Sequence, residues 1–557
     1  MNRQAISHQS RGLDCFALNG HGFRIRLHTG RGDFDRVCLM YSLNKYQWAS
    51  HRERPMRKWL SDALYDHYDI DLYGQDTRLA YVFVLYRGGE RWVFSEEGLS
   101  KRFEDAQAYF HHFQYPFIHE RDIHRAPDWV DRTVWYQIFP ERFANGLGPK
   151  PYINAQWGDR PAPDSFFGGD LVGIARHLDY LQFLGVNGLY LTPVFRAPSN
   201  HKYDTLDYEE ADGGFGGTQA LRDLAQAAHR RGMRLMLDGV FNHCSWDHPF
   251  FQDVERRGRK SPYWSWFFID GDRPDRAAVN YLTFGSVPYM PKFNTGHPEV
   301  IRYFCGVAER WMKACGVDGW RLDVMDELSA AFLRAFRETV KAQNPDALVI
   351  GELWHAPESY LRGDQLDGVM NYGLTKALAD YLVTGALDAA GLRDRLCLLL
   401  TRCTAPSSRM MLNLLDCHDT HRFLTLLRGS VPRLKLALCL LFFFVGMPCV
   451  YYGDEIGMQG GYDPDCRRAF PWDEASWNRD LLAHVRRLAQ LRTCGALAGD
   501  DIALAVSGDV FCLSRKRLRL LVNATEHPAA YAVPGAKGIL KPLSFHIDTQ
   551  PEKERET

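Results

Sequence analysis

The chain has 557 residues, of which 46% are hydrophobic and 24% charged, and its 67 basic and 68 acidic residues give a formal net charge of −1. These values are typical of a globular protein with an ample core and length for roughly three domains. The neutral balance argues against a dedicated nucleic-acid or acidic-membrane binder, which needs a basic excess or patch. Aromatic residues make up 13% of the chain, so they either fill a large core or form platforms on which sugar rings stack.

The 13 cysteines include no Cys-x-x-Cys pair, so we predict neither a zinc site nor a disulfide framework. Free thiols fit a reducing compartment, and the N-terminus lacks the apolar run of a signal peptide. Residues 436–452 are uncharged, but this stretch is short and is interrupted by Gly446 and Pro448. It predicts a buried helix, at about 432–445, and a buried strand rather than a membrane span. We therefore expect a cytoplasmic protein with no membrane partner.

The first 122 residues have the pattern of β structure. Segments 23–30 and 36–43 alternate apolar and polar side chains, as half-buried strands do. Two further predicted strands flank the pair Gly88 and Gly89, which is typical of a hairpin turn. We predict a separate β-sandwich domain over residues 1–122.

From residue 123 onward, short apolar strands alternate with amphipathic helices, of which 171–185 and 218–232 each end on glycine. The pattern predicts an α/β fold, a (β/α)₈ TIM barrel over residues 123–492. The long gap after the third strand predicts an inserted subdomain at about 244–298. Residues 493–557 predict a small C-terminal β domain with a frayed tail. The eight predicted barrel strands are 133–139, 187–195, 233–243, 319–322, 347–352, 368–371, 411–416 and 448–452.

Polar residues stand at the ends of several of these strands, and in such a barrel all those ends meet at one face. Each acid alone has a structural explanation as an ion-pair partner, a helix cap or a surface residue. Several apolar strands that end in carboxylates at one face are hard to place in a passive core. The residues are Asp238 and His243 on the third strand, Arg321 and Asp323 at the fourth, Glu352 at the fifth, and His418 and Asp419 after the seventh.

Carboxylates beside histidines and an arginine, with no Ser or Cys nucleophile motif and no Gly-rich phosphate loop, favour cleavage of a glycosidic bond. One carboxylate attacks the anomeric carbon while a second carboxyl group donates its proton to the leaving oxygen. Arg321 lies two residues before Asp323 on an alternating strand, so both side chains should point the same way. We expect the guanidinium to keep Asp323 ionised.

Four motifs occur in the order that the α-amylase superfamily of glycoside hydrolases requires. They are DGVFNH (238–243), GWRLDV (319–324), GELWH (351–355) and LLDCHD (414–419). Each resembles one of that superfamily's four main signature regions, and the resemblance extends over nearly the whole length of the chain.

Further segments resemble one group within the superfamily, formed by neopullulanases, cyclomaltodextrinases and maltogenic amylases. These are WYQIFPERFANG (135–146), HKYDTLDY (201–208), MPKFN (290–294) and the stretch from YYGDEIGM to DPDCRR (451–468). The predicted N-terminal β domain is also similar to that group's starch-binding-type module.

The resemblance implies a retaining hydrolase of α-1,4-glucosidic bonds in cyclodextrins, maltodextrins or pullulan, which requires no cofactor. It also implies a homodimer formed through the N-terminal domain. By position it makes Asp323 the nucleophile, Glu352 the general acid/base and Asp419 the acid that stabilises the transition state. The substrate-binding residues that it implies are Tyr203, Asp238, His243, Phe284, Arg321, Trp354, His418, Asp463 and Arg467.

The chain departs from the family pattern in two places. A family calcium site would use Asn145, Gly168 and Asp170, but LGPKPY (147–152) replaces the acidic run that completes it. Because calcium takes six to eight oxygen ligands, we expect at most a weak site. Met325-Asp326 and His421 also differ, and they lie where the acceptor sugar should bind.

Two other functions remain open from the sequence. One is a glucan transferase or isomerase of the same family, because the departures near the acceptor sugar leave transglycosylation and linkage preference open. The other is a binding protein on an inactive amylase scaffold. Such proteins typically lack the catalytic acids and carry a membrane span, whereas this chain keeps Asp323, Glu352 and Asp419.

Overall fold

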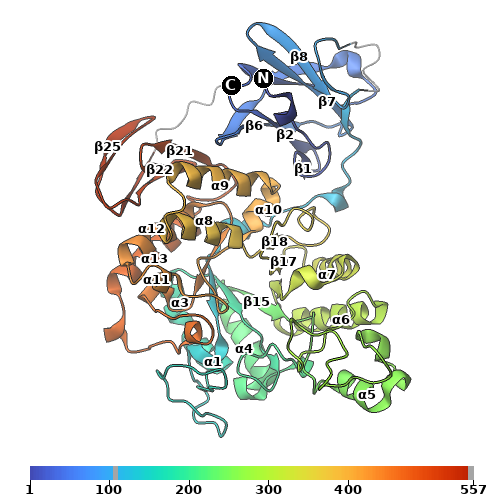
Figure 1. Ribbon diagram of the computed structural model, residues 1–557, viewed down its shortest axis with the longest axis vertical. Coiled ribbons are helices and arrows are strands. Elements are labelled where there is room, and N and C mark those ends of the chain that lie inside the picture. The colour runs from blue at the N-terminus through green and yellow to red at the C-terminus, as the bar shows by residue number, and fades with distance from the viewer. Residues whose placement is uncertain (104–110, 550–557) are drawn as a thin grey trace.

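The computed structural model describes residues 1–103 and 111–549. The predicted frayed tail, residues 550–557, lies outside the described residues. In the N-terminal part of the described chain, two antiparallel sheets pack face to face around one apolar core, at the top of Figure 1. One sheet has the order β1 (Cys15–Asn19), β2 (Gly22–Gly30), β6 (Tyr65–Tyr73), β5 (Arg57–Ser61). The other has the order β4 (Arg52–Pro55), β3 (Arg36–Ser42), β7 (Leu79–Arg87), β8 (Glu90–Ser95), β9 (Gly98–Ser100), with β10 (Phe113–Tyr115) beside β7.

Within the described chain, eight parallel strands form the central sheet, and a parallel bridge between Met370 and Leu412 joins its two edges into a barrel. The strands are short and buried along their length, which is why each appeared in the sequence as an apolar run. The predicted (β/α)₈ fold is therefore confirmed. The strands are β11 (Trp135–Ile138), β12 (Gly188–Leu191), β15 (Arg234–Gly239), β16 (Gly319–Leu322), β17 (Leu348–Gly351), β18 (Gly368–Val369), β19 (Leu412–Asn413) and β20 (Met447–Tyr451).

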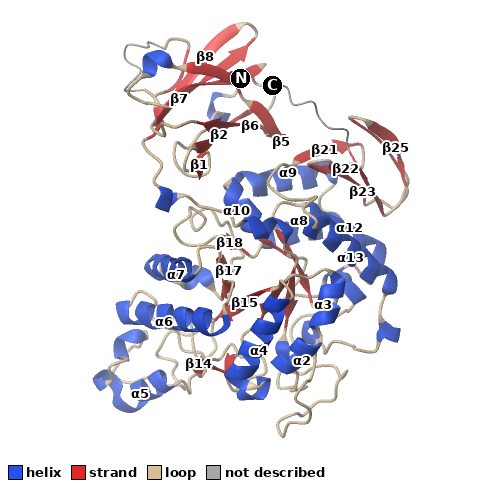
Figure 2. Cartoon of the chain, turned by 180° about the vertical axis from the view of Figure 1, so that it is seen from behind, coloured by secondary structure: helices blue, strands red, loops and turns tan. Residues whose placement is uncertain are grey.

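Helices surround the barrel (Figures 1 and 2). The predicted helix 171–185 is divided in two at His177, whose ring bonds the Gly173 carbonyl at 2.8 Å, and Gly185 ends the second part in a left-handed conformation. The larger helices are α3 (Leu178–Leu184), α4 (Gly217–Arg230), α6 (Pro298–Cys315), α7 (Ala330–Gln343), α8 (Tyr372–Leu382), α9 (Ala389–Thr401), α12 (Val431–Phe443) and α13 (Arg479–Thr493). Shorter ones are α1 (Pro140–Phe143), α2 (Leu171–Arg176), α10 (Ala405–Met410) and α11 (Phe423–Leu426).

The uncharged stretch predicted as a buried helix and strand forms α12 and β20, and both are covered by the rest of the protein. Among the described residues, none of the helices combines the length and apolarity that a bilayer span requires.

The insertion predicted after the third strand runs between β15 and α6. It contains α5 (Pro249–Arg257) and isolated β-bridges that join Phe267 to Phe293 and Thr283 to Pro291. A further bridge, between His243 and Lys292, fixes this segment against the end of β15. The insertion therefore forms one wall of the barrel's C-terminal face. A small hairpin, β13 (Phe195–Arg196) and β14 (Asp207–Ala211), precedes α4.

A C-terminal β unit follows α13 and lies against α12, at the left of Figure 1. Arg515, the last residue of β22 in this unit, is buried, and its Nη1 donates to the Phe443 carbonyl at 2.8 Å. The N-terminal sandwich contacts the barrel beside α9 and α10, where Arg26 Nη1 donates to the Cys403 carbonyl at 2.7 Å. The C-terminal strands are β21 (Ala503–Ser507), β22 (Val510–Arg515), β23 (Leu518–Asn523) and β26 (Ser544–Thr549) in one sheet, with β24 (Ala529–Val533) and β25 (Ala536–Leu540) paired separately.

Candidate active site

One buried guanidinium contacts three carboxylates at the C-terminal face of the barrel. Arg321 Nη1 lies 3.0 Å from Asp238 Oδ1 and 2.8 Å from Asp323 Oδ1, and Nη2 lies 3.0 Å from Glu352 Oε2. The strand register explains this grouping, because Asp238 on β15 pairs directly with Arg321 on β16. Asp323 follows β16 and Glu352 follows β17, the neighbouring strand. Sequence-predicted residues from three strands are thus brought together around one positive charge.

Glu352 is also held by the backbone. Val324 has a φ of 45°, in the left-handed region, and its N–H donates to Glu352 Oε2 at 2.9 Å. A β-branched residue is strained in that conformation. The strain occurs one residue after Asp323, where it aims a backbone donor at the neighbouring acid.

The charge balance of this cluster differs from the sequence expectation. Burial raises the pKa of Asp323 well above its ordinary value, while Arg321 opposes the rise and the nearby Glu352 adds to it. Burial likewise raises the pKa of Asp238 to about 6. We expected Arg321 to keep Asp323 ionised, but its single charge is shared by three acids. Fully ionised, the group would have two uncompensated negative charges in a buried site, which disfavours simultaneous ionisation of all three acids.

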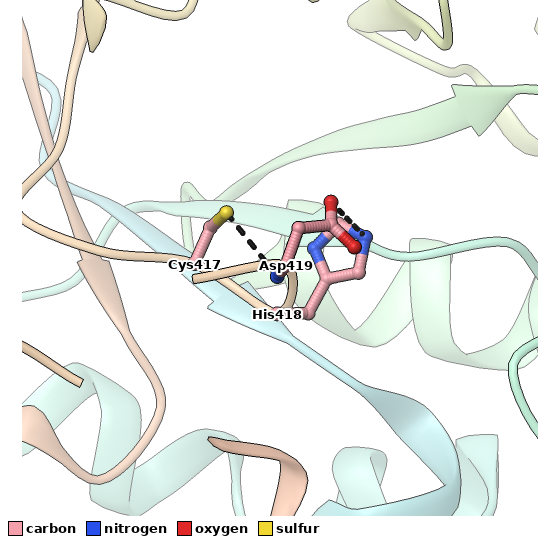
Figure 3. A group of neighbouring side chains, drawn as sticks. All are labelled: Cys417, His418 and Asp419. Carbon is pink, nitrogen blue, oxygen red and sulfur yellow. Dashed lines mark hydrogen bonds and ion pairs between the residues drawn. The ribbon is translucent and has the colours of Figure 1, made fainter. Parts of the chain in front are cut away.

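Asp419 approaches from the loop after β19 and is about one-third exposed (side chain 32%). Its Oδ1 lies 3.0 Å from Arg467 Nη2, and its Oδ2 lies 3.1 Å from His418 Nε2, as Figure 3 shows for the histidine. Arg467 also contacts Asp463 at 3.0 Å and donates from Nε to the His418 carbonyl at 2.7 Å. Asp419, His418, Arg467 and Asp463 therefore form one connected polar group.

Figure 3 also shows Cys417, whose Sγ could join His418 and Asp419 as a metal ligand by distance alone. Burial raises the pKa of the Cys417 thiol, so the thiolate that metals prefer does not form readily. His418 Nδ1 bonds Gln137 and its Nε2 bonds Tyr203. Both ring nitrogens of His418 are therefore engaged by neighbouring residues of the site.

The two predicted histidines are neutral. Burial together with the Arg467 charge lowers the pKa of His418 well below its ordinary value, and burial with Lys292 lowers the pKa of His243 to about 3. Tyr203 lies parallel to His418, with ring planes 1° apart, and its hydroxyl reaches Asp238 at 3.1 Å. Among the described residues, His243 Nε2 is buried without a hydrogen-bond partner. Such an orphaned nitrogen is suited to bind an incoming hydroxyl group.

Aromatic rings flank this group on two sides. Phe284, from the insertion, stacks on His243 with ring centroids 4.7 Å apart. Trp354, just after β17, stacks on Tyr372 at 3.7 Å and leaves 49% of its surface exposed. The site thus joins buried acids to a half-exposed aromatic face, a combination that suits an uncharged ring-containing substrate.

Comparison with known proteins agrees with this geometry. Residues 137–481 match the family described as alpha amylase, catalytic domain, and residues 1–119 match the alpha amylase N-terminal ig-like domain. The chain belongs to the α-amylase family. A cyclomaltodextrinase from Geobacillus thermopakistaniensis (strain MAS1) is 44% identical over 521 residues, covering 91% of this chain and 88% of the relative. A cyclomaltodextrinase from Thermoanaerobacter pseudethanolicus is 42% identical over 554 residues, covering 97% and 96%.

A solved cyclomaltodextrinase structure also matches, with a TM-score of 0.90 and 38% identity over 96% of this chain and 94% of that one. The match includes the N-terminal sandwich as well as the barrel, since it spans nearly the whole chain. The family resemblance inferred from the motifs is therefore confirmed.

The three residues of the family calcium site lie together beside the barrel. However, Lys150 Nζ donates to the Gly168 carbonyl at 2.5 Å and to Asp170 Oδ2 at 2.8 Å. The Asn145 amide oxygen accepts the Gly148 N–H at 2.8 Å. The Lys150 ammonium group occupies two of the oxygens that calcium would need, and the Asn145 amide oxygen is already hydrogen-bonded. These residues therefore do not fit a calcium site.

Sequence reasoning missed several residues of the site. Gln137 on β11 bonds His418, and its signal was a polar residue inside an apolar strand. Lys292 contacts Glu327 at 2.7 Å and also donates to the Asn242 amide oxygen. No sequence pattern marks the pairing of Lys292 with Glu327, because the inserted segment brings Lys292 to Glu327 from a distant part of the chain.

Proposed function

We propose that the chain is a retaining hydrolase of α-1,4-glucosidic bonds that acts on cyclodextrins, maltodextrins or pullulan. The observation that carries this proposal is the attachment of Asp323 and Glu352 to the two terminal nitrogens of one guanidinium. Carboxylates held in that way lie close together, as retaining glycosidases require for direct attack on the sugar. The names of the two curated relatives favour cyclodextrins as the substrate.

The contacts of Asp323 and Glu352 leave one carboxyl oxygen of each acid free to react. Arg321 binds Asp323 through Oδ1, which leaves Oδ2 as the attacking atom. Val324 and Arg321 both bind Glu352 through Oε2, which leaves Oε1 to hold the proton. A carboxyl group whose one oxygen accepts a backbone N–H and lies beside a fixed guanidinium carries its proton on the other oxygen, toward the bond to be broken.

Reaction proceeds in two displacements. Asp323 Oδ2 attacks the anomeric carbon while Glu352 donates its proton to the glycosidic oxygen, so the bond to the leaving sugar breaks as a glycosyl ester forms. Glu352, now a carboxylate, takes a proton from water, and the oxygen of that water attacks the anomeric carbon. Asp323 is released as a carboxylate and Glu352 regains its proton, so the enzyme returns to its starting state.

The remaining residues bind the sugar. Asp419, oriented by His418 and Arg467, accepts hydrogen bonds from sugar hydroxyls that strengthen as the ring flattens in the transition state. His243 and His418 are neutral, so they bind hydroxyls without adding charge to the site. Tyr203, Phe284 and Trp354 provide the stacking surfaces, and Asp463 with Arg467 binds the donor side.

The test compares purified wild type with Glu352→Gln and Asp323→Asn on β-cyclodextrin, pullulan and soluble starch. We expect wild type to open β-cyclodextrin faster than starch and each variant to lose at least about 100-fold in kcat. Glu358→Gln is the matched control, because Glu358 follows the same strand but pairs with Arg402. Unchanged turnover by Glu352→Gln would refute the mechanism, and preference for starch would refute the substrate class.

We also propose a cytoplasmic homodimer formed through the N-terminal domain. All 13 cysteines are free thiols, which supports a reducing compartment. Light scattering on the full chain tests the dimer, with a mass near twice 64.0 kDa expected. A mass near 64.0 kDa at micromolar concentration would contradict it.

A further inference from the structure

Asp170 is a fully buried carboxylate whose surroundings are complete without a metal ion. It caps the N-terminus of α2, accepting from the Gly173 N–H at 2.7 Å. Its other bonds come from the loop after β11, from Gly146 N at 3.1 Å and Leu147 N at 2.9 Å. A side chain at Gly146 would collide with the backbone of Gly173, so loop and helix are in close contact here. Asp170 therefore fastens that loop to α2.

The positive charge for this carboxylate comes from within the same loop. Lys150 Nζ lies 2.8 Å from Asp170 Oδ2 and 2.5 Å from the Gly168 carbonyl oxygen, and its side chain is only 9% exposed. An ammonium has three donors, and two of them are directed at oxygens that point into the loop. A long charged side chain is rarely buried unless it is paired in this way.

The side-chain oxygen of Asn145, which a calcium site here would also use, is already hydrogen-bonded within its own turn. Asn145 Oδ1 accepts from Gly148 N, and Asn145 Nδ2 donates to the Gly148 carbonyl at 3.0 Å, so the amide closes its own turn. Calcium needs six to eight oxygens at 2.3–2.6 Å, and a fixed ammonium would repel a divalent ion at the same position. The loop cannot hold both cations.

We infer that the Lys150 ammonium is the resident cation of this loop, so the chain binds no calcium there and needs none to fold. The lysine supplies one charge permanently, by covalent attachment, where a metal would have to be captured from solution. This loop also adjoins the active site. Arg142, in helix α1 just before the loop, donates from Nε to the Arg467 carbonyl at 3.0 Å, and Arg467 contacts Asp419.

The test begins with wild type. After incubation with calcium chloride and gel filtration, metal analysis should find well below one calcium ion per chain, at most about 0.1. The melting temperature should be the same in excess EDTA and in calcium chloride. One bound calcium ion per chain, or a lower melting temperature in EDTA, would overturn the inference. Both measurements are made without any variant, so they do not depend on a variant that folds.

The second arm uses Lys150→Met and a matched control, Lys341→Met. Lys341 is placed similarly elsewhere, since its Nζ donates to the Ala347 carbonyl at 2.6 Å and lies 2.8 Å from buried Asp367, which Arg337 also contacts at 2.9 Å. Both variants should melt below wild type in EDTA. At millimolar concentration, calcium should partly restore the melting temperature of Lys150→Met, because the Gly168 carbonyl and Asp170 Oδ2 are then free and waters can complete the coordination shell, and it should leave Lys341→Met unchanged. Equal responses of the two variants to calcium would overturn the cation-replacement role and leave an ordinary ion pair.

Discussion

Gln137 Nε2 lies 2.8 Å from His418 Nδ1, and both side chains are buried. The amide nitrogen can only donate, so it fixes Nδ1 as the acceptor and places the ring proton on Nε2. That nitrogen faces Tyr203 and Asp419. A residue on β11 thus sets which atom of His418 can donate to a sugar hydroxyl.

Gln137→Met removes this donor while it keeps the size of the side chain. The ring is then free to rotate or to change tautomer, so sugar binding should weaken. We expect KM for β-cyclodextrin to rise about 10-fold, as when an orienting partner of a functional histidine is lost. Steady-state kinetics measures the change in KM and kcat separately.

The control for this variant is Asn413→Leu. Asn413 is another buried amide at the barrel, but it bonds Asn371 and the Val445 carbonyl instead of a site residue. This change should lower the melting temperature and leave KM in place. If both variants raise KM equally, Gln137 acts through barrel stability and does not position His418.

Arg321→Lys should separate folding from catalysis. An ammonium can satisfy part of the charge of Asp238, Asp323 and Glu352, but it lacks the planar fork that contacts all three at once. We expect a folded protein whose kcat falls at least about 100-fold, because Asp323 and Glu352 are no longer held by one group. Arg321→Met, which leaves the buried acids without a positively charged partner, should be destabilised by about 3–5 kcal/mol.

Activity assays and denaturant unfolding measure these two effects, with Arg409→Lys as the comparison. Arg409 makes a two-point contact with Asp131, at 3.0 and 2.8 Å, away from the site. Its replacement should lower stability and keep kcat. Full activity in Arg321→Lys would contradict the shared-guanidinium mechanism.

The sequence was sufficient to predict the eight barrel strands and the acids at their ends. Both follow from local pattern, because a buried parallel strand is a short apolar run and a polar residue at its end interrupts that run. Arg321 and Asp323 were placed on one side of β16 for the same reason. The motifs then supplied the family, which the comparisons confirm.

The features that were missed depend on contacts between distant segments. The sharing of Arg321 among three acids follows from the register of β15 and β16, which no single strand encodes. The pairing of Lys150 with Asp170 requires the loop conformation, and the sequence showed only that acidic residues were missing there. The break at His177 coincides with a side-chain bond from its ring to the Gly173 carbonyl, inside an otherwise regular helical pattern.

Buried histidines should make the protein less stable in acid. Burial lowers the pKa of His248 to about 3, against about 6.5 in the unfolded chain. Between those values the unfolded state binds more protons than the native state, so stability falls as pH falls below about 6.5. From pH 7 to pH 5 one such histidine removes about 2 kcal/mol.

His248→Asn should remove this pH-dependent loss of stability, because asparagine does not take up a proton. Asparagine can still cap α5, as His248 does by accepting from the Phe250 N–H. Denaturant unfolding at pH 7 and pH 5 measures the difference, with the exposed His21→Asn as control. The prediction fails if the two variants lose the same stability on acidification.

The half-exposed ring of Trp354 should decide how well the site holds an acceptor sugar. Tyr372 supports its inner face at 3.7 Å, so the outer face is a rigid platform beside Glu352. Trp354→Ala removes the platform and leaves the acids in place. A stacked ring contributes about 0.5–1.5 kcal/mol beyond its buried area, so transfer of glycosyl groups to added maltose should fall about 2- to 10-fold relative to hydrolysis.

Chromatography of the products measures this ratio of transfer to hydrolysis. The control is Phe183→Ala, which removes an equally exposed ring on α3 and should not change the ratio. A constant ratio in Trp354→Ala would contradict this role of Trp354. The acceptor sugar would then bind elsewhere, and His421, which packs beside Tyr462 with ring centroids 5.6 Å apart, would be the next residue to replace.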